Sequence, residues 1–452
     1  MRQTTERVSM GRVRGLRVRL GVGALAGLAL VLPGIQPPAT AAAARSTQPT
    51  FATYETGFVG GEPTVGVLKD GSIVAQAYHK VVRSSDRGRT WKLLHEAPEA
   101  SLDPYIHVDE ATGRIFTSQL LGACQSIYIS DDNGAAWTPR PTQCGTGDHQ
   151  KLGSGPWHED TSHLYPRNVY SCFNHVSDTA CATSLDGANT WLPPVVVFPG
   201  VDPTATDGVG GIATFCGGLS GDPVSGPDGT IYLPREYCGR PFVAVSTDDG
   251  LTWERRQVAA PSQARPIAFG ANNPAVSVAA DGTVFYAWTG GDYAHYLSRS
   301  RDRGVTWSKP WRLSPPGVGS TTFPVVIAGR AGAVATGFIG TVGSAGKNPQ
   351  DVAKSSRWHL YLATTMNGNA TAPTWTTQRV TKDPVMPGCV GRHAATSCSN
   401  SALLDFNDIA LDRSGRIVMS YGDACPKGCR EPKAAPDATV GIVVQTGGPS
   451  FS

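Results

Sequence analysis

The chain has 452 residues, of which 53 are glycine and 34 are proline, while charged residues make up only 17%. Because glycine and proline at this frequency interrupt helices, a helical bundle or coiled coil is excluded. Hydrophobic residues make up 40% and the formal net charge is +3, which also excludes an intrinsically disordered chain. A large β-rich globular body is the class that remains.

Residues 1–44 have the three-part plan of a secretory signal peptide. Six arginines and one acid accompany an apolar run from Leu20 to Leu32, which small residues from Ala39 to Ala44 follow. The apolar run is shorter than the roughly 20 residues of a membrane span, so no stable membrane anchor is expected. Without this segment the formal charge falls from +3 to about −2, which gives a nucleic-acid partner no electrostatic support. We predict a secreted, extracellular protein with one domain over residues 45–452.

The first repeated element is an apolar hairpin with a turn rich in Asp and Gly. In its first copy, Val65 and Val67 precede the turn at Asp70-Gly71, and Ile73 follows it. Apolar runs that flank such a turn predict a β-hairpin. The predicted hairpins cover residues 65–74, 106–116, 224–232, 276–285 and 409–418.

The second repeated element has the pattern S-x-D-x-[GA]-x-[TA]-W. Its five copies are Ser84–Trp91, Ser130–Trp137, Ser184–Trp191, Ser246–Trp253 and Ser300–Trp307. The Asp side chain of such a turn accepts backbone N–H bonds, and Gly takes the positive φ that other residues resist. The Trp is expected to pack between neighbouring sheets. The tryptophans are 46, 54, 62 and 54 residues apart, which is the scale of a four-stranded propeller blade with insertions.

These repeats predict an all-β fold, a single β-propeller of six to seven four-stranded blades, with seven favoured. Two blades without a clear copy of the second element are expected at about residues 322–380 and 403–446. The last of them shows only three good strands. We therefore expect residues 51–57 to supply its fourth strand and close the ring, which removes exposed sheet edges.

All ten cysteines lie in the predicted domain. An even count in an exported chain predicts disulfides, and we expect neighbouring cysteines to pair. The expected pairs are Cys124–Cys144, Cys172–Cys181, Cys216–Cys238, Cys389–Cys398 and Cys425–Cys429. The alternative is a zinc site, but Cys425 and Cys429 form one loose pair without a second pair at zinc-ribbon spacing.

The repeated S-x-D-x-G-x-T-W resembles the Asp box of the sialidase (neuraminidase) superfamily, the BNR-repeat β-propellers. The likeness covers nearly the whole of residues 45–452 as a blade pattern. It implies a propeller fold. Similar boxes occur in sialidases, other glycan hydrolases, lyases and non-enzymatic propellers. The box therefore does not indicate which reaction, if any, the protein catalyses.

Both predicted turns of a blade fall on one face of the ring, so the opposite face should carry the polar side chains that converge on the axis. These side chains belong to the loops that lead into the innermost strand and the loops that leave the second strand. The positions are occupied by Glu62, His79, Asp103, Gln119, Asp148, His149, Asn174, Arg235, Glu236, Tyr237, Asn273, Asp292, Arg330, Asp408, Tyr421 and Asp423.

A set so rich in carboxylates has three interpretations. Two carboxyl groups can flank a glycosidic bond as acid and base or nucleophile, and crowding of like charges would raise the pKa of one of them. Alternatively, the acidic and amide oxygens can hold a Ca²⁺ ion. The third interpretation is that they are solvated loop residues, because Asp and Asn are favoured in turns. For the set as a whole we favour a ligand site.

The resemblance to sialidases implies specific roles. That family holds the substrate carboxylate with three arginines, and here Arg235 is the first candidate. An Arg-Ile-Pro run normally opens the first blade, but the corresponding residues are Gly61-Glu62-Pro63, so this arginine is missing. The other candidate arginines are Arg167, Arg265, Arg330 and Arg392.

The same resemblance implies a tyrosine nucleophile activated by a glutamate, and an aspartate as acid/base. The implied catalytic residues are Tyr237 or Tyr421, Glu236 or Glu62, and Asp103 or Asp148. The expected sugar-binding residues are His79, His149, Asn174, Asn273, Trp288, Asp292, Arg330 and Asp408. Among the aromatic residues, Trp288 is the preferred stacking platform because two glycines follow it near a strand end.

We therefore predict a secreted, sialidase-like glycoside hydrolase that releases a terminal acidic sugar from extracellular glycans and acts as a monomer. Two alternatives stay open: a non-catalytic propeller that binds glycan or protein, and a polysaccharide lyase. Convergence of two or three arginines beside a Tyr–Glu pair would favour the sialidase. No serine-hydrolase elbow or nucleotide-binding P-loop occurs in residues 45–452.

Overall fold

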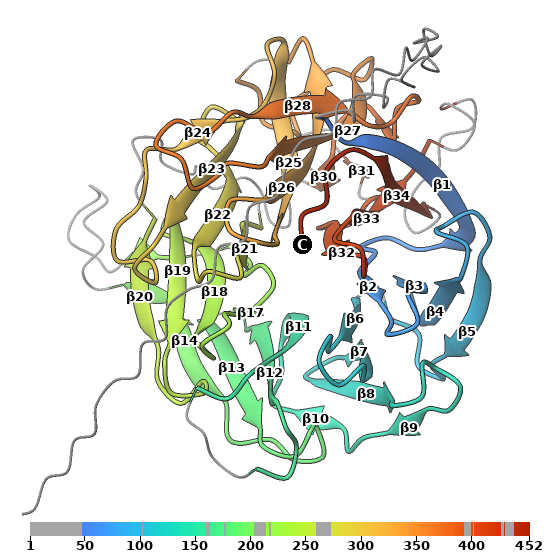
Figure 1. Ribbon diagram of the computed structural model, residues 1–452, viewed down its shortest axis with the longest axis vertical. Helices are drawn as coiled ribbons and strands as arrows, with labels where there is room; N and C mark the ends of the chain where they lie inside the picture. The colour runs from blue at the N-terminus through green and yellow to red at the C-terminus, as the bar shows by residue number, and fades with distance from the viewer. Residues whose placement is uncertain are drawn as a thin grey trace, which may run out of the picture. The chain divides into compact units, whose positions relative to one another are not determined.

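The computed structural model describes residues 48–101, 103–158, 163–175, 178–202, 214–216, 218–258, 273–344, 346–392, 399–400, 402–425, 429 and 438–452. The chain divides into two units, residues 1–44 and residues 45–452, and all described residues belong to the second. This unit is a β-propeller of seven blades, and each blade is an antiparallel sheet (Figure 1). The predicted fold class and the favoured number of blades are confirmed.

The blades follow one another along the chain, and in each the first strand lies nearest the axis (Figure 1). Blades 1 to 3 consist of β2 (Val65–Val67), β3 (Ile73–Ala77), β4 (Lys80–Ser84) and β5 (Lys92–Glu96); β6 (Pro104–Val108), β7 (Ile115–Leu121), β8 (Cys124–Ser130), β9 (Thr138–Pro139) and β10 (Gln143–Cys144); and β11 (Asp148–Gly155), β12 (Asn168–Asn174), β13 (Asp178–Ser184) and β14 (Val195–Pro199). Two short extra ladders join β15 (Val201–Asp202) to β16 (Thr214–Phe215) and β30 (Gly391–Arg392) to β31 (Ser399–Asn400).

Blades 4 to 7 repeat the same order. They consist of β17 (Val224–Ser225), β18 (Ile231–Tyr237), β19 (Arg240–Ser246) and β20 (Glu254–Gln257); β21 (Ala275–Val278), β22 (Val284–Thr289), β23 (His295–Ser300) and β24 (Trp311–Arg312); β25 (Val318–Ala328), β26 (Val334–Val342), β27 (Arg357–Thr365), β28 (Thr376–Arg379) and β29 (Met386–Pro387); and β32 (Asp408–Leu411), β33 (Ile417–Asp423), β34 (Thr439–Gly447) and β1 (Thr50–Val59).

The S-x-D turn, shared by the five copies of the second repeat, links the third strand of a blade to its outer edge. In the first copy Asp86 accepts hydrogen bonds from Ser84 Oγ at 2.8 Å and from the Thr90 amide at 2.9 Å. The Gly88 amide donates to Ser84 Oγ at 2.8 Å, and Gly88 has a φ of 86°. The other four copies repeat the bonds among Ser, Asp and the backbone. The Ser and Asp side chains of each turn are therefore hydrogen-bonded within the turn.

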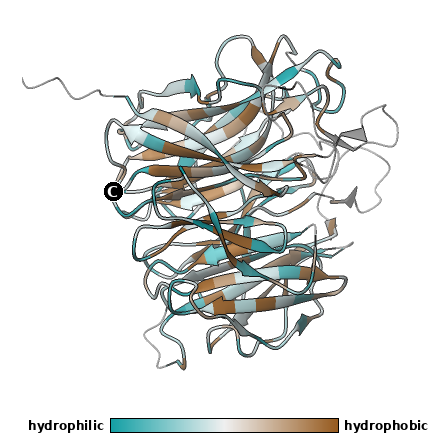
Figure 2. Cartoon of the chain, turned by 90° about the vertical axis from the view of Figure 1, so that its right-hand side faces the viewer, coloured by the Kyte–Doolittle hydropathy of each residue, from teal (hydrophilic) through white to brown (hydrophobic). Residues whose placement is uncertain are grey.

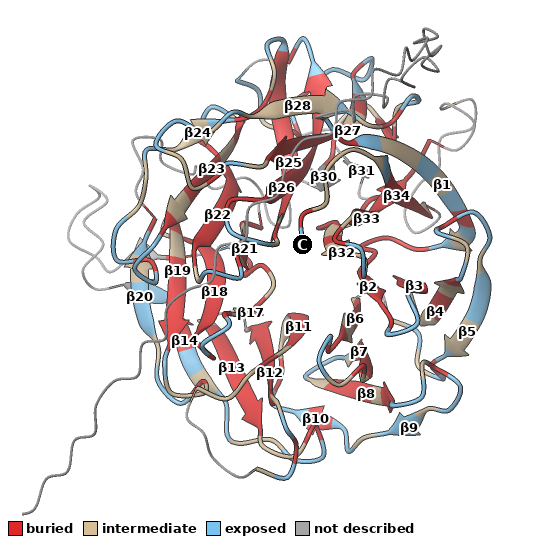
Figure 3. Cartoon of the chain, viewed as in Figure 1, coloured by how far each residue is buried: buried red, intermediate tan, exposed pale blue. Residues whose placement is uncertain are grey.

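The tryptophan of each S-x-D turn packs against the body of the propeller, as expected. The ring of Trp137, in blade 2, stacks on His95 of blade 1 with centroids 4.4 Å apart. Hydrophobic residues are distributed along the strands of the sheets (Figure 2). The inner strands are buried, whereas the outer strands β5, β9 and β20 are largely exposed (Figure 3). Every blade is thus held by its neighbours through apolar side chains.

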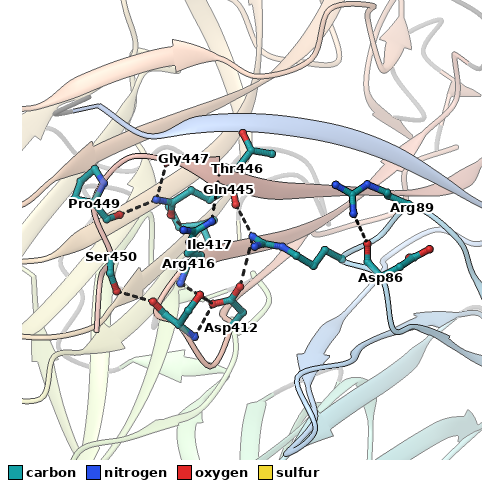
Figure 4. Close-up of polar contacts among 12 residues, drawn as sticks. Asp86, Arg89, Asp412, Arg416, Ile417, Gln445, Thr446, Gly447, Pro449 and Ser450 are labelled. Carbon is teal, nitrogen blue, oxygen red and sulfur yellow. Dashed lines mark hydrogen bonds and ion pairs between the residues drawn. The ribbon is translucent and has the colours of Figure 1, made fainter. Parts of the chain in front are cut away.

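The first described strand closes the ring. β1 pairs with β34 of the last blade, for example Phe51 with Gln445 and Glu55 with Gly441. Figure 4 shows the polar contacts at this closure, where Asp412 and Gln445 of blade 7 lie near the turn that contains Asp86. The closing strand that the sequence predicts at residues 51–57 is confirmed.

Four of the five expected disulfides lie in the described residues and are confirmed. They are Cys124–Cys144, Cys172–Cys181, Cys216–Cys238 and Cys425–Cys429. The expected partner of Cys389 is Cys398, which lies outside the described residues. Within the described part of the chain, no helix is long and apolar enough to cross a membrane.

Candidate functional site: a carboxyl cluster on the propeller axis

The innermost strands of the seven blades surround an axial channel of about 360 Å³. The first and third turns of each blade lie at one end of this channel, which we call the turn face. The loops that lead into the innermost strands lie at the other end, which we call the funnel face. The side chains that line the channel include Lys151, His149, Asn273 and Asp408. Polar groups from different blades therefore meet on the axis.

Four carboxyl groups gather at the funnel face, and we call Glu62, Asp103, Asp148 and Asp405 the axial carboxyl cluster. Each residue stands at or just before the innermost strand of its blade, in blades 1, 2, 3 and 7 respectively. Glu62 is 2% exposed, whereas Asp103, Asp148 and Asp405 are partly exposed. The cluster thus has a buried base and a rim that solvent can reach.

Hydrogen bonds tie the cluster to its neighbours across blades. Glu62 Oε1 accepts from the Asp405 amide at 3.0 Å. The side-chain amide of Asn273 lies 2.9 Å from His149 Nε2, and the same amide nitrogen lies 3.4 Å from the Asp405 carbonyl oxygen. Glu62 and His149 both adopt positive φ, 51° and 58°, which is uncommon for residues with a side chain.

Burial and mutual repulsion raise the pKa values of these carboxyl groups. Burial, and then the charge of Asp148, raises the pKa of Asp103 to about 6. Burial, and then Asp103, raises the pKa of Asp405 to about 7, and burial followed by Asp405 raises the pKa of Glu62 well above its usual value. Burial also raises the pKa of Asp148. Carboxyl groups with raised pKa values are suited to act as proton donors near neutral pH.

One cationic side chain among the described residues lies under this cluster. Lys151 is 1% exposed, and its Nζ lies 3.6 Å from Asp222 Oδ1 and 2.9 Å from the centre of the Phe406 ring. Burial lowers the pKa of Lys151, while the charges of Asp222 and Glu62 oppose that shift. A single lysine therefore faces several carboxyl groups.

The sequence predicts part of this site and misses part of it. Glu62, Asp103, Asp148, His149 and Asn273 were predicted at the funnel end of the channel, and the structure brings them together there. Asp408 lies further along the channel, where its carboxylate accepts from the Val65 amide at 2.8 Å and burial raises its pKa to about 7.

The missed residues are Asp405, Lys151 and Asp222. Asp405 lies three residues before β32 begins, as Glu62 lies three residues before β2 begins, and counting from the strand start would have found it. Lys151 lies in the innermost strand β11, whose other residues are mostly polar or small, so no apolar pattern marked it as buried.

Arg235 is placed away from the cluster. It is 3% exposed, and its guanidinium donates to the carbonyl oxygens of Cys216 at 3.3 Å and Gly218 at 3.0 Å as well as to Thr179 Oγ1. These contacts use the guanidinium of Arg235 within the protein, so it is not available to bind a substrate carboxylate.

The residues next to Arg235 and the predicted tyrosines are also buried. Tyr237 is 1% exposed and donates from its hydroxyl to the Pro199 carbonyl at 2.9 Å. Glu236 is 6% exposed, and Tyr421 is 3% exposed, with its ring against Gly441. The structure therefore does not assemble the predicted Tyr–Glu pair at the axial cluster.

Other predicted sugar-binding residues lie apart from the cluster. Trp288, the preferred stacking platform, is 1% exposed and packs between Tyr286 and Tyr296, so its ring is not available to a sugar. His79 lies near the edge of blade 1, where its Nε2 is 3.0 Å from Glu96 Oε1. The glycines that follow Trp288 do form a turn, but Trp288 is the penultimate residue of β22 and its ring stays buried.

Three further predicted residues are positioned by their own loops. Asn174 accepts from Thr179 Oγ1 at 2.8 Å and is 3% exposed. Asp292 is exposed and accepts from the Tyr296 hydroxyl at 3.0 Å. Arg330 belongs to the β25–β26 turn and lines a second cavity of about 510 Å³ together with Asp412 and Arg413, which places it on the turn face rather than on the funnel face.

The remaining candidate arginines do not join the cluster in the described residues. Arg167 lies 3.4 Å from Asp109 Oδ2. Arg265 and the side chain of Arg392 lie outside the described part of the chain.

Three groups at the base of the cluster offer a possible metal site. Ligand atoms of Glu62, His149 and Asp405 all lie within 4.8 Å of one another. The set combines one imidazole and two carboxylates. A Ca²⁺ ion prefers oxygen ligands alone, whereas imidazole suits transition-metal ions.

The chain matches no protein-family model and no curated protein. Similar solved structures include a protein of unknown function from Dyadobacter fermentans, at 15% identity over 88% of this chain and 98% of that chain, with a TM-score of 0.45. A variant of the NanB sialidase from Streptococcus pneumoniae is 13% identical over 88% and 71% of the two chains, with a TM-score of 0.42. A leech intramolecular trans-sialidase is 13% identical over 85% and 68%, with a TM-score of 0.40. These values are too low to assign an activity to this chain.

Proposed function

We propose that this protein is a glycoside hydrolase that acts on extracellular glycans at the axial carboxyl cluster. The observation that carries the proposal is the meeting of Asp103 and Asp148, from neighbouring blades, at the partly exposed rim of the axial channel. Most glycoside hydrolases place two carboxyl groups on either side of the glycosidic bond that they cleave. The disulfides support an extracellular location, because such bonds persist in oxidising compartments.

The two aspartates are suited to different roles. Asp103 is the proposed general acid, since a pKa of about 6 keeps a useful fraction protonated near neutral pH. It would donate its proton to the leaving oxygen of the scissile bond. Asp148 is the proposed base or nucleophile, and the separation of the two carboxyl groups in the substrate complex would set whether configuration is retained or inverted.

The charge around the site bears on the substrate. In the described residues, the cation acting on the cluster is Lys151, which lies buried beneath it. A sugar carboxylate would therefore be repelled at the rim, and we propose an uncharged sugar at the point of cleavage. The resemblance to sialidases implies an acidic sugar, so sialosides belong in the test.

The proposal is tested by screening the purified protein on fluorogenic glycosides of neutral sugars, uronic acids and sialic acid. The variants Asp103→Asn and Asp148→Asn remove one carboxyl group each with little change of shape. Asp131→Asn is the matched control, because Asp131 lies on the turn face, away from the cluster, with its Oδ1 2.6 Å from Arg114 Nε. Folding is checked by circular dichroism and thermal melting.

We expect turnover of at least one neutral glycoside, loss of that turnover in both cluster variants, and wild-type turnover in the control. Turnover confined to sialosides would replace the neutral substrate with an acidic one. Saturable glycan binding without any turnover would assign a binding function instead. Turnover that survives in both cluster variants would refute the proposed site.

A further inference from the structure

We propose that Glu62, His149 and Asp405 bind one divalent metal ion of the zinc or manganese class at the funnel end of the axial channel. The three residues come from blades 1, 3 and 7, so the ion would join blades that are distant in the sequence. This site goes beyond the proposed hydrolase, because metal binding needs no sugar and can be measured without one.

The geometry fits a single ion. The three ligand atoms all lie within 4.8 Å of one another. Metal–ligand bonds are roughly 2.0–2.4 Å long, so two ligand atoms on opposite sides of an ion are about 4.0–4.8 Å apart. Two neighbouring ligand atoms are closer than that. The base of the cluster therefore has room for an ion between the three side chains after small movements.

An unpartnered oxygen points independently to a ligand. Glu62 is 2% exposed, and its Oε2 is buried with no hydrogen-bond donor from the protein, while Oε1 is used by the Asp405 amide. A buried carboxylate oxygen without a partner is costly, so native proteins usually supply a donor or a cation. A metal ion at this point would satisfy that oxygen.

The surroundings also suit a metal ligand at His149. The ring is buried, stacks edge-on against Phe406 with centroids 5.0 Å apart, and lies 2.9 Å from the Asn273 amide through Nε2. A metal-bound histidine typically places its second ring nitrogen in such an outer hydrogen bond, and the Asn amide can present either its oxygen or its nitrogen by rotation. Asn273 would orient the ring.

Charge balance favours a cation over a further proton as the neutralising species. Asp103 and Asp148 lie at the rim of the same cluster, and Lys151 is the cation below it. A divalent ion would offset two negative charges at once. The rival explanation is a single proton shared between the hydrogen-bonded side chains of Glu62 and Asp405, an arrangement that does not use the second ring nitrogen of His149.

The choice of metal follows from the ligands. One imidazole and two carboxylates match Zn²⁺ or Mn²⁺ better than Ca²⁺, which takes oxygen ligands alone, typically six to eight of them. The Ca²⁺ ion considered from the acidic composition is therefore the weaker candidate at this position.

The test is calorimetric titration of the chelator-treated, untagged protein with Zn²⁺, Mn²⁺ and Ca²⁺. We expect one Zn²⁺ or Mn²⁺ per chain, with Ca²⁺ bound at least about 10-fold more weakly. His149→Gln and Glu62→Gln should weaken binding by about 100-fold or more, because each removes a direct ligand. His175→Gln is the control, since His175 forms a histidine–carboxylate pair with Asp178 without a third ligand.

A wild-type protein that binds no ion, or a His149→Gln variant that binds as tightly as wild type, would overturn the inference. If Glu62→Gln fails to fold, Asp405→Asn and anomalous diffraction from wild-type crystals soaked in zinc decide the question. An anomalous peak bounded by all three residues supports the site, and a peak elsewhere or no peak refutes it. Metal binding with no turnover on any glycoside would leave this site standing while the proposed hydrolase falls.

Discussion

The aspartates on the two faces of the propeller behave in opposite ways. On the turn face, Asp86 accepts hydrogen bonds from the Thr90 hydroxyl, the Thr90 amide and Ser84 Oγ, and these bonds lower its pKa to about 2. On the funnel face, burial raises the pKa of Asp103 to about 6 and that of Asp405 to about 7. An aspartate surrounded by hydrogen-bond donors therefore stays ionised and stabilises a turn. An aspartate that is buried near other carboxyl groups has a raised pKa, which suits it to proton transfer.

The largest expected effect separates activity from stability. If the carboxylates of the funnel face are the reactive ones, Asp103→Asn should lower kcat/KM on the best glycoside by roughly 10²–10⁴-fold, the usual contribution of a general acid. Asp248→Ala, in an S-x-D turn on the other face, should leave kcat/KM within about 2-fold of wild type. Steady-state kinetics on both variants checks this, and equal losses in the two would erase the distinction between the faces.

The converse experiment measures stability. Asp248 accepts from Ser246 Oγ at 2.8 Å and from the Thr252 amide at 2.9 Å. Because Asp248→Ala leaves these donors without an acceptor, we expect it to lower the free energy of unfolding by about 1–2 kcal/mol. Urea titration provides the measurement. An unchanged midpoint would show that the turns hold without their aspartates.

Asp103→Asn should have the opposite effect on stability. Since the folded-state pKa of Asp103 is raised to about 6, the fold favours its protonated form, and the cost of the buried charge appears as pH rises through that value. In chelator at pH 7.5 the variant should therefore melt about 1–3 °C higher than wild type, and the difference should vanish below about pH 4. A lower melting temperature at pH 7.5 would contradict the raised pKa.

The smallest effect is the shape of the stability profile against pH. Lowered pKa values at the turn aspartates, Asp86, Asp132, Asp186, Asp248 and Asp302, contribute stability that is present above about pH 4 and lost as pH falls toward 2. The raised pKa values of Asp103 and Asp405 have the opposite effect, because the folded protein loses stability as pH rises through about 6–7 and these groups ionise. Urea midpoints in chelator should peak between these limits, and a midpoint that rises steadily from pH 4 to pH 8 would count against the cluster.

The fold could be predicted from the sequence because its signals are local. Each S-x-D turn supplies its own hydrogen bonds over a few residues, so Ser84–Trp91 and its copies keep their pattern in the sequence. The closing strand could be inferred because blade 7 visibly lacked one strand. The repeated strand and turn order also indicated which loops share a face, and the structure brings Glu62, Asp103 and Asp148 together on that face.

The rest of the site depends on contacts between separate segments of the chain, which no local sequence pattern indicates. Blade 7 has no S-x-D turn to set its register, so Asp408 was chosen and Asp405, three residues earlier, was missed. Arg235 carries a charge that suits a substrate, but both terminal nitrogens of its guanidinium donate to backbone carbonyl oxygens between Phe198 and Gly218, 17 to 37 residues earlier in the chain. Such long-range partners decide whether a charged side chain binds the protein itself or a ligand.

The pairing of β1 with β34 has a consequence for how the domain is made. These strands are almost four hundred residues apart, as in the hydrogen bond between Thr439 and Glu55 with a separation of 384 positions. Local sheets can form early, but circularisation has to await the final strand, and closing so long a loop is entropically unfavourable and slow. Until β1 pairs with β34, the first and last sheets have unpaired edges. These edges can pair with other chains, so aggregation is the main hazard for the open ring.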